Sequence, residues 1–226
     1  MNVKSNMKEI LQYLSDLDQN NNSEWFHANK PRYDRARNTY LVVVQKVIDL
    51  LQFDDPRLSG LEAKDAMFRI FRDIRFSKDK TPYKTHFGAY MARGGRKSRE
   101  AGYYLHIGND EMFLAAGVHS PEKADLHAVR QEILYQPDTF GSLLETKRTQ
   151  GYSTSERDKL VKGPMGFPKD SPHIEYLKYK HYLLSHPLAE QELFAENAPA
   201  VIAGHFRELV PFTEFINTAL EFKGNE

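Results

Sequence analysis

The chain has 226 residues, of which 40% are hydrophobic and 27% are charged, and its 31 basic side chains balance its 31 acidic side chains. This composition is typical of a folded globular protein and argues against a disordered chain. The absence of cysteine excludes disulfides, thiolate metal sites and cysteine nucleophiles.

The N-terminal stretch mixes charged and apolar residues and lacks the apolar block of a signal peptide. No apolar run approaches the roughly 18 residues of a membrane span. We therefore expect a soluble, cytoplasmic protein with no membrane partner. The length and the lack of a long linker predict a single domain over residues 1–226.

Helical periodicity dominates the first quarter of the chain. Apolar residues from Met7 to Leu17 recur every three or four positions, which predicts a helix over 3–18. Ser23 is expected to cap a short turn that carries Trp25 and Phe26. Pro31 suits the first turn of a longer helix that ends near residues 54–56.

The pattern then changes to the two-residue period of strands. Four strands are predicted, at 67–76, 85–92, 101–107 and 112–119, and a fifth at 180–185. Asn109 and Asp110 fit a two-residue hairpin turn, and short connections favour antiparallel neighbours. Helices are expected after Pro121 and again over 188–222, and 163–172 is expected to be a loop. The predicted fold is α+β, with a single antiparallel meander sheet of four to five strands flanked by N-terminal and C-terminal helices.

A register can be chosen by its ability to gather apolar residues on one sheet face. Pairing Gly108 with Glu111, and Tyr90 with Tyr104, achieves this. Arg72 falls on the apolar face and would need a carboxylate partner or an exit to solvent. The opposite face is polar and aromatic, and it collects Arg69, Phe71, Asp73, Arg75, His86, Tyr90, Tyr104, His106 and Phe113.

Such a face on a rigid sheet can orient a ligand. Alternatively, the C-terminal helices cover it and its polar groups bond internally. Between residues 69 and 99, ten basic side chains face two acidic ones, a local charge of +8. This segment could meet an anion or nucleic acid, or pair with acidic helices elsewhere.

Within that face, Arg69 and Arg75 could hold one anion, with Asp73 between them setting their orientation. The alternative is a structural network of the same three residues. Tyr90 and Tyr104 are the further candidate ligand-binding residues. If catalysis occurs, His86 or His106 would be the general base.

A metal site from these two histidines and Glu111 is conceivable, but no metal is predicted because no metal-binding motif supports it. The sequence identifies no cofactor.

Two segments resemble the signature of the bacterial domain-of-unknown-function family 2461. They are the run Arg69-Ile-Phe-Arg-Asp-Ile-Arg-Phe-Ser-Lys-Asp-Lys-Thr-Pro-Tyr-Lys84 and the upstream run Asn22-Ser-Glu-Trp-Phe-His-Ala-Asn-Lys-Pro-Arg-Tyr33. The later run 163–172 fits less closely, because a histidine is expected where Ser171 stands. The resemblance spans nearly the whole chain and implies no activity.

Three hypotheses of function follow. The first is binding of an anionic small molecule on the polar sheet face, with catalysis left open. The second is a structural or interaction protein without chemistry. The third is a weak nucleic-acid-binding module that uses residues 69–99, which the neutral net charge disfavours. The sequence does not indicate an oligomeric state.

Overall fold

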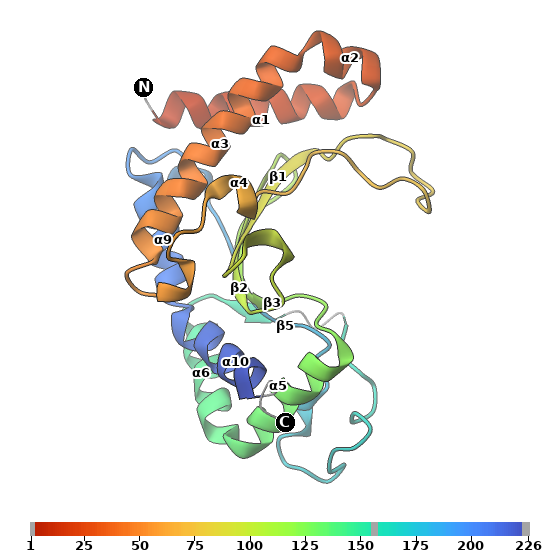
Figure 1. Cartoon of the computed structure of the whole chain (residues 1–226), viewed down its shortest axis with the longest axis vertical. Coiled ribbons are helices and arrows are strands. Elements are labelled where there is room, and N and C mark those ends of the chain that lie inside the picture. Colours follow the sequence, from red (N-terminus) through yellow and green to blue (C-terminus); the bar gives the residue numbers. More distant parts are fainter. Residues whose placement is uncertain (1–2, 155–157, 223–226) are drawn as a thin grey trace. The chain divides into compact units, whose positions relative to one another are not determined.

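The computed structural model describes residues 3–154 and 158–222. The protein has an α+β fold with a five-stranded antiparallel sheet in the order β1-β2-β3-β5-β4, which confirms the predicted fold class (Figure 1). The strands are β1 (His86–Met91), β2 (Gly102–Gly108), β3 (Met112–Val118), β4 (Ser153–Thr154) and β5 (Tyr182–Pro187). The helices are α1 (Val3–Gln19), α2 (Ser23–Ala28), α3 (Lys30–Leu51), α4 (Ala63–Ala66), α5 (Lys123–Tyr135), α6 (Pro137–Thr149), α7 (Ile174–Leu177), α8 (Glu190–Leu193), α9 (Ala198–Arg207) and α10 (Val210–Phe222), with short 3₁₀ helices η1 (Pro56–Leu58) and η2 (Gly95–Lys97).

The chain divides into two compact units. The first comprises Met1–Lys97, Tyr104–Leu114 and Pro187–Arg207, and the second comprises Ser98–Tyr103, Ala115–His186 and Glu208–Glu226. Strands β2 and β3 contribute residues to both units. The expectation of one domain over residues 1–226 stays a prediction.

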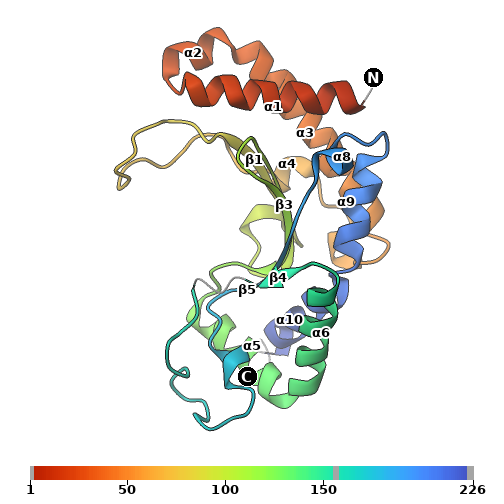
Figure 2. The same cartoon turned by 180° about the vertical axis from the view of Figure 1, so that it is seen from behind.

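In the first unit, α3 packs against α1, α9 and β1 (Figure 2). The apolar stripe of α3 explains this position, because Tyr40, Val44 and Val47 on it are fully buried. The Tyr40 hydroxyl donates a hydrogen bond of 2.8 Å to the carbonyl of Leu105 in β2. A buried tyrosine hydroxyl usually finds such a partner, and here it ties the helix to the sheet.

The helix starts follow the sequence closely, with one correction. Asn22, and not Ser23, caps α2: its side-chain oxygen accepts from the Trp25 N–H at 2.9 Å. Asn22 has the extended backbone of a cap residue, whereas Ser23 already belongs to the helix. Pro31 lies in the first turn of α3, as predicted.

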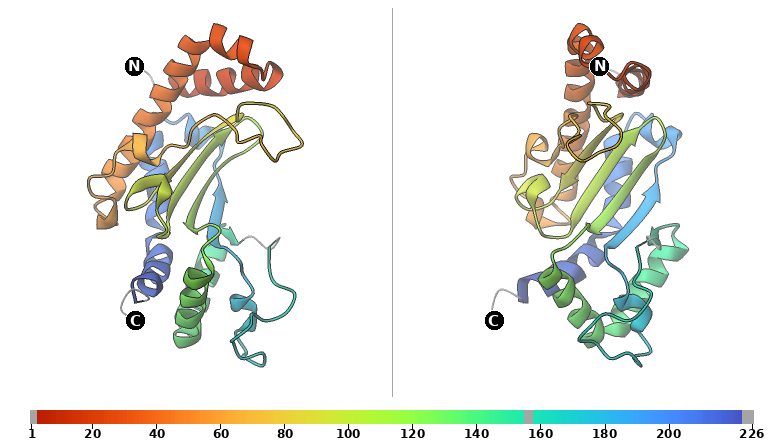
Figure 3. Two further views of the ribbon diagram at one scale, coloured as in Figure 1. Left: turned by 45° about the vertical axis from the view of Figure 1, so that its right-hand side comes forward. Right: turned by 90° about the vertical axis from the view of Figure 1, so that its right-hand side faces the viewer.

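The predicted strand over 67–76 requires a larger correction. Only two isolated antiparallel bridges form there, from Met67 to Ala89 and from Phe71 to Tyr83. Residues 73–80 then form a loop that extends from the sheet of the first unit (Figure 3).

Hydrogen bonds within the segment, several of them from side chains, take the place of the backbone hydrogen bonds that a strand would make with a neighbouring strand. Arg72 pairs with Asp79 and Thr81, so the carboxylate partner that the sequence required lies within the loop. The Lys80 ammonium donates to the carbonyl of Ile74 at 3.0 Å.

The other predicted strands form. The Gly108 N–H donates to the carbonyl of Glu111 at 3.1 Å, which fits the two-residue turn between β2 and β3. Leu105, Ile107 and Leu114 are fully buried, as expected for the apolar face. The predicted strand over 180–185 corresponds to β5, and β4 is a short strand that the sequence did not predict.

The second unit has its own aromatic core. Helix α10 packs against α5 and α6. The Phe140 ring lies 5.3 Å from that of Phe215 and 6.2 Å from that of Phe212, measured between centroids. β4 pairs antiparallel with β5. Over residues 3–154 and 158–222, no helix combines the length and apolar character that crossing a membrane requires.

Candidate functional site

A cluster of aromatic and polar side chains lies on the sheet of the first unit. It consists of His86, Tyr104, His106 and Phe113, and we call these four residues the imidazole cluster. His86 begins β1, Tyr104 and His106 lie in β2, and Phe113 lies in β3. Because alternate residues of a strand share a face, Tyr104 and His106 point to the same side.

The rings of the cluster are in close contact. The imidazoles of His86 and His106 have centroids 4.2 Å apart, and the His106 ring stacks on Phe113 at 4.7 Å. The Tyr104 hydroxyl lies 3.1 Å from Nδ1 of His106. His106 is only 7% exposed, so the centre of the cluster is largely shielded from water.

Two glycines provide the space for these rings. A Cβ on Gly88 would lie 2.5 Å from the Tyr104 hydroxyl. A Cβ on Gly108 would lie 3.1 Å from Cβ of His86 and 3.2 Å from Nε2 of His106. Since real Cβ atoms do not approach that closely to Tyr104, a side chain at position 88 would displace the ring.

Burial keeps the imidazoles neutral. It lowers the pKa of His106 to about 4. Burial, followed by the neighbouring His106 and Lys84, lowers the pKa of His86 to about 4. Burial and the nearby Glu111 carboxylate raise the pKa of Tyr104 to about 12. At neutral pH the cluster therefore contains two uncharged imidazoles and a protonated phenol.

The hydrogen bond between Tyr104 and His106 can fix one tautomer. With the His106 proton on Nε2, the Tyr104 hydroxyl donates to Nδ1, and Nε2 lies 4.0 Å from Oε1 of Glu111. Tyr104 thus orients the His106 ring, and Glu111 lies on its other side.

One cation, Lys84, lies close to the cluster, and a second, Arg69, lies close to Lys84. Burial, and secondarily the positive charge of Arg69, lower the pKa of Lys84. Lys84 in turn lowers the pKa of His86, and its ammonium lies 5.5 Å from the centroid of the Phe68 ring. In the part of the chain that the structure describes, no ion pair joins Lys84 or Arg69 to a carboxylate. Within the described residues, neither cation is therefore neutralised by a direct ion pair.

The expected arginine clamp is divided between two places. Arg75 forms two hydrogen bonds with Asp73 in the loop, Nε to Oδ1 at 2.9 Å and Nη2 to Oδ2 at 2.6 Å. The Arg75 side chain is 76% exposed, and its hydrogen bonds lower the pKa of Asp73. Arg69 is exposed and lies near Lys84, and Tyr90 is partly exposed in β1.

The two most distinctive sequence segments pack together. The Phe26 ring stacks on the Tyr83 ring at 4.1 Å, and Phe71 contacts both rings. Asn21, directly before the first segment, bonds to the backbone of Tyr83 in the second segment. Much of the distinctive sequence therefore builds the framework that positions the strand of His86.

The sequence predicts His86, Tyr104 and His106 as site residues, and the structure brings these three side chains together. It did not select Lys84, Gly88 or Gly108 as site residues. Glycine within a strand was the available signal, because it weakens a strand and often marks close approach of another group. Among residues 3–154 and 158–222, no group of three or more His, Cys, Asp or Glu side chains could hold a metal ion.

The model of one protein family matches residues 9–215 of the chain, and the family is described as "Conserved hypothetical protein (DUF2461)". The match covers most of the sequence and confirms the resemblance drawn from the two segments. No curated protein and no solved structure matches the chain.

Proposed function

We propose that this chain, which belongs to the DUF2461 family, binds a small anionic molecule beside the imidazole cluster. One observation carries the proposal: Lys84 places positive charge beside the neutral imidazole of His86, Arg69 lies near Lys84, and neither cation is paired with a carboxylate in the described residues. Two neighbouring cations repel each other, and an anion between them relieves that repulsion.

The proposed contacts divide the ligand into two parts. Lys84 and Arg69 contact its anionic group, such as a phosphate or carboxylate. His86 and Tyr104 contact the rest of the molecule, and Tyr90 is a further candidate on β1. Lys84, and not Arg75, is the second cation that contacts the anion in this proposal, because Asp73 already neutralises Arg75. A cytoplasmic location, expected from the sequence, is part of the same proposal.

Binding, and not proton transfer, is the function that we propose. A general base works best when its pKa lies near the operating pH. His86 and His106, with pKa values of about 4, are weak bases in the unliganded protein. An anion beside Lys84 would raise the pKa of His86, so binding should be accompanied by proton uptake in mildly acidic buffer.

Thermal denaturation with inorganic phosphate, pyrophosphate, acetate and citrate tests the proposal. A ligand at a hundred times its Kd stabilises the folded state by about 2.7 kcal/mol, which raises the Tm by roughly 5–10 °C. Lys84→Met should abolish this rise and preserve the buried aliphatic stem. The matched control is Lys30→Met, which removes an exposed lysine that pairs with Asp34.

Titration calorimetry in two buffers of different ionisation enthalpy then measures the proton uptake. Uptake near pH 5 that disappears in Lys84→Met supports the proposal. If none of the four anions raises the Tm, or if Lys84→Met responds as the parent does, the proposal is wrong.

A further inference from the structure

A pocket of about 420 Å³ lies beside α6 in the second unit. Its first wall is one face of α6, formed by Gly141, Leu144, Glu145 and Arg148. The last three follow Gly141 by three, four and seven residues, a spacing that places all four on one side of the helix. The volume lies within the usual range for small-molecule sites, about 300–1,000 Å³.

The opposite wall of the pocket is aromatic. It contains Tyr152 before β4, Tyr176 in α7 and Tyr179 before β5. Tyr152 and Tyr179 are buried and Tyr176 is half-buried. The Tyr176 hydroxyl lies against α6, because a Cβ on Gly141 would be 3.0 Å from it. The Tyr179 hydroxyl lies 3.0 Å from Oγ1 of Thr154. Rings held in this way favour a planar aromatic ligand, because aromatic pairs gain more than their buried area alone.

The charged side chains of the pocket favour an anion. Three charged residues line it, and two of them are basic: Arg148 and Lys159 against Glu145. The Lys159 ammonium lies 4.2 Å from the centroid of the Tyr179 ring. Arg148 is exposed on α6 and forms no ion pair within residues 3–154 and 158–222. A guanidinium matches a carboxylate or a phosphate with two parallel hydrogen bonds.

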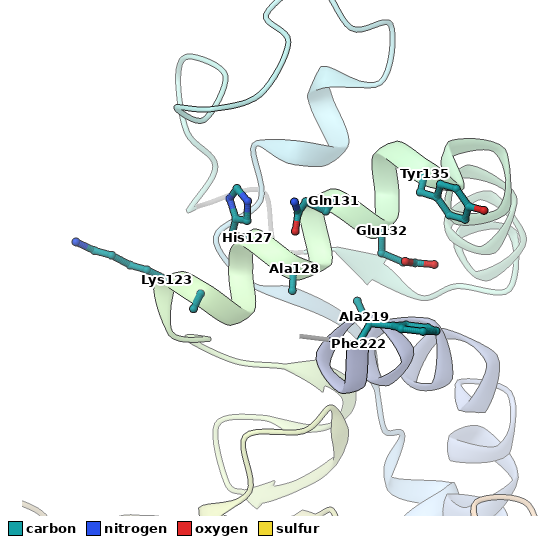
Figure 4. Close-up of a pocket in the computed structure, with 9 residues that line it drawn as sticks. Lys123, His127, Ala128, Gln131, Glu132, Tyr135, Ala219 and Phe222 are labelled. Carbon is teal, nitrogen blue, oxygen red and sulfur yellow. The ribbon is translucent and has the colours of Figure 1, made fainter. Parts of the chain in front are cut away.

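A buried cation supports the same sign of charge. The outer face of α5 lines a groove with α10 (Figure 4), whereas Arg130 lies on the buried inner face and is 8% exposed. Its Nη2 donates to the carbonyl of Tyr179 at 3.0 Å, and its Nε has no hydrogen-bond partner among the described residues. No carboxylate in that part of the chain forms an ion pair with it.

A buried charge without a counter-ion is costly, and the protein interior screens it weakly. Arg130 bonds to the backbone of Tyr179, whose ring lines the pocket. An anion in the pocket therefore reduces the cost of burying Arg130 without touching it.

We propose that this pocket binds a small aromatic acid, a molecule that joins one planar ring to a carboxylate or a phosphate. The ring packs among the three tyrosines, and Arg148 and Lys159 bind the anionic group. Arg130 contributes through its charge alone, and Glu145 opposes the anion. The site is distinct from the imidazole cluster and does not depend on the function proposed for that cluster.

An NMR titration with phenyl phosphate tests the proposal. It is carried out on Lys84→Met, so that the imidazole cluster does not contribute, and the amide signals of the residues that line the pocket should shift. Inorganic phosphate lacks the ring and phenol lacks the charge, so each should bind roughly tenfold more weakly or worse. The response of the parent chain to inorganic phosphate therefore still reports on the imidazole cluster.

Two neutral substitutions on α6 should have opposite effects on the Kd for phenyl phosphate. Arg148→Gln removes the main anion contact and should raise the Kd by about fivefold or more. Glu145→Gln removes the opposing carboxylate and should lower the Kd by about twofold to fivefold. Arg35→Gln, at an exposed position of α3, is the control and should leave the Kd unchanged.

The proposal is wrong if phenyl phosphate does not bind to Lys84→Met, or if Arg148→Gln binds it as tightly as Arg35→Gln does. A Glu145→Gln variant that binds more weakly contradicts it equally, because the pocket would then favour a positively charged group. Equal affinities for phenyl phosphate and inorganic phosphate would remove the aromatic part of the ligand and overturn the assignment.

Discussion

The side-chain amide of Asn21 makes two hydrogen bonds to the backbone of Tyr83: Nδ2 donates to its carbonyl at 3.0 Å, and its N–H donates to Oδ1 at 3.1 Å. An amide used in this way acts as a short strand partner. It joins the segment between α1 and α2 to the chain that leads into β1, where His86 lies. In the second unit, the side-chain amide of Asn217 makes the same two hydrogen bonds to the backbone of Ala101: its Nδ2 donates to the carbonyl, and its Oδ1 accepts from the N–H.

Replacing Asn21 with aspartate should be costly. A carboxylate can still accept from the Tyr83 N–H, but it has no proton to donate to the Tyr83 carbonyl. We expect a loss of about 2 kcal/mol, measured by urea denaturation. The matched control is Asn22→Asp, because Asn22 serves only as an acceptor in its cap and aspartate caps equally well. Equal losses in the two variants would contradict this account.

Adding one methyl group at Gly88 should disturb the imidazole cluster. The new Cβ would lie 2.5 Å from the Tyr104 hydroxyl, so the ring must move and its bond to His106 must lengthen. We expect Gly88→Ala to lose about 1–3 kcal/mol of stability. Gly204→Ala is the control: nothing lies within 4 Å of its Cβ, and alanine should stabilise α9 by about 0.5–1 kcal/mol. If Gly88→Ala has the same stability as the parent, the sheet accommodates the extra methyl group and this account is wrong.

Stability should fall as the pH is lowered from 6.5 toward 4. In the unfolded chain His86 and His106 take up protons near pH 6.5, but in the folded protein their pKa values are lowered to about 4. The unfolded state therefore binds more protons within this window. Each histidine contributes at most about 1.4 kcal/mol per pH unit, and less where solvent reaches the ring.

His86→Phe isolates this effect, because phenylalanine keeps a ring beside His106 but cannot be protonated. Its stability should depend less steeply on pH than that of the parent over the same window. His27→Phe, which replaces an exposed histidine outside the imidazole cluster by the same residue, is the comparison variant. Urea denaturation at closely spaced pH values provides the comparison, and parallel curves for His86→Phe and the parent would refute the assignment.

Arg75→Ala should hardly affect the fold. Its pair with Asp73 is exposed, and solvent screens such pairs. We expect a change in Tm of less than about 2 °C. A large fall in Tm would mean that the pair supports the structure of the loop, although it is exposed to solvent.

Local patterns in the sequence were sufficient to predict most helices and four of the five strands. The spacing from Met7 to Leu17 and the proline at position 31 mark α1 and α3, because helix periodicity and first-turn proline depend on near neighbours. The alternation over 67–76 was misleading. It resembles a strand, but side chains such as Arg72 and Asp79 satisfy each other within the loop and no continuous ladder forms.

The candidate site was predictable only in part for the same reason. A plausible register brought His86 and His106 onto neighbouring strands, and the rings do make contact. Lys84 lies two residues before His86, so the alternation of an extended segment was the available signal for their proximity. The groove of α5 depends on where α10 packs, and residues so distant in the sequence leave no local signal.

The Tyr104 ring fills the space that a side chain at position 88 would need. A larger residue at 88 therefore cannot arise on its own during the divergence of related chains. A larger residue at 88 is tolerated only together with a smaller one at 104, and losing the phenol also deprives the imidazole at 106 of its bond. Covariation of these two positions across the family, with histidine at 106 lost whenever the phenol is lost, is the evolutionary record that this geometry should leave.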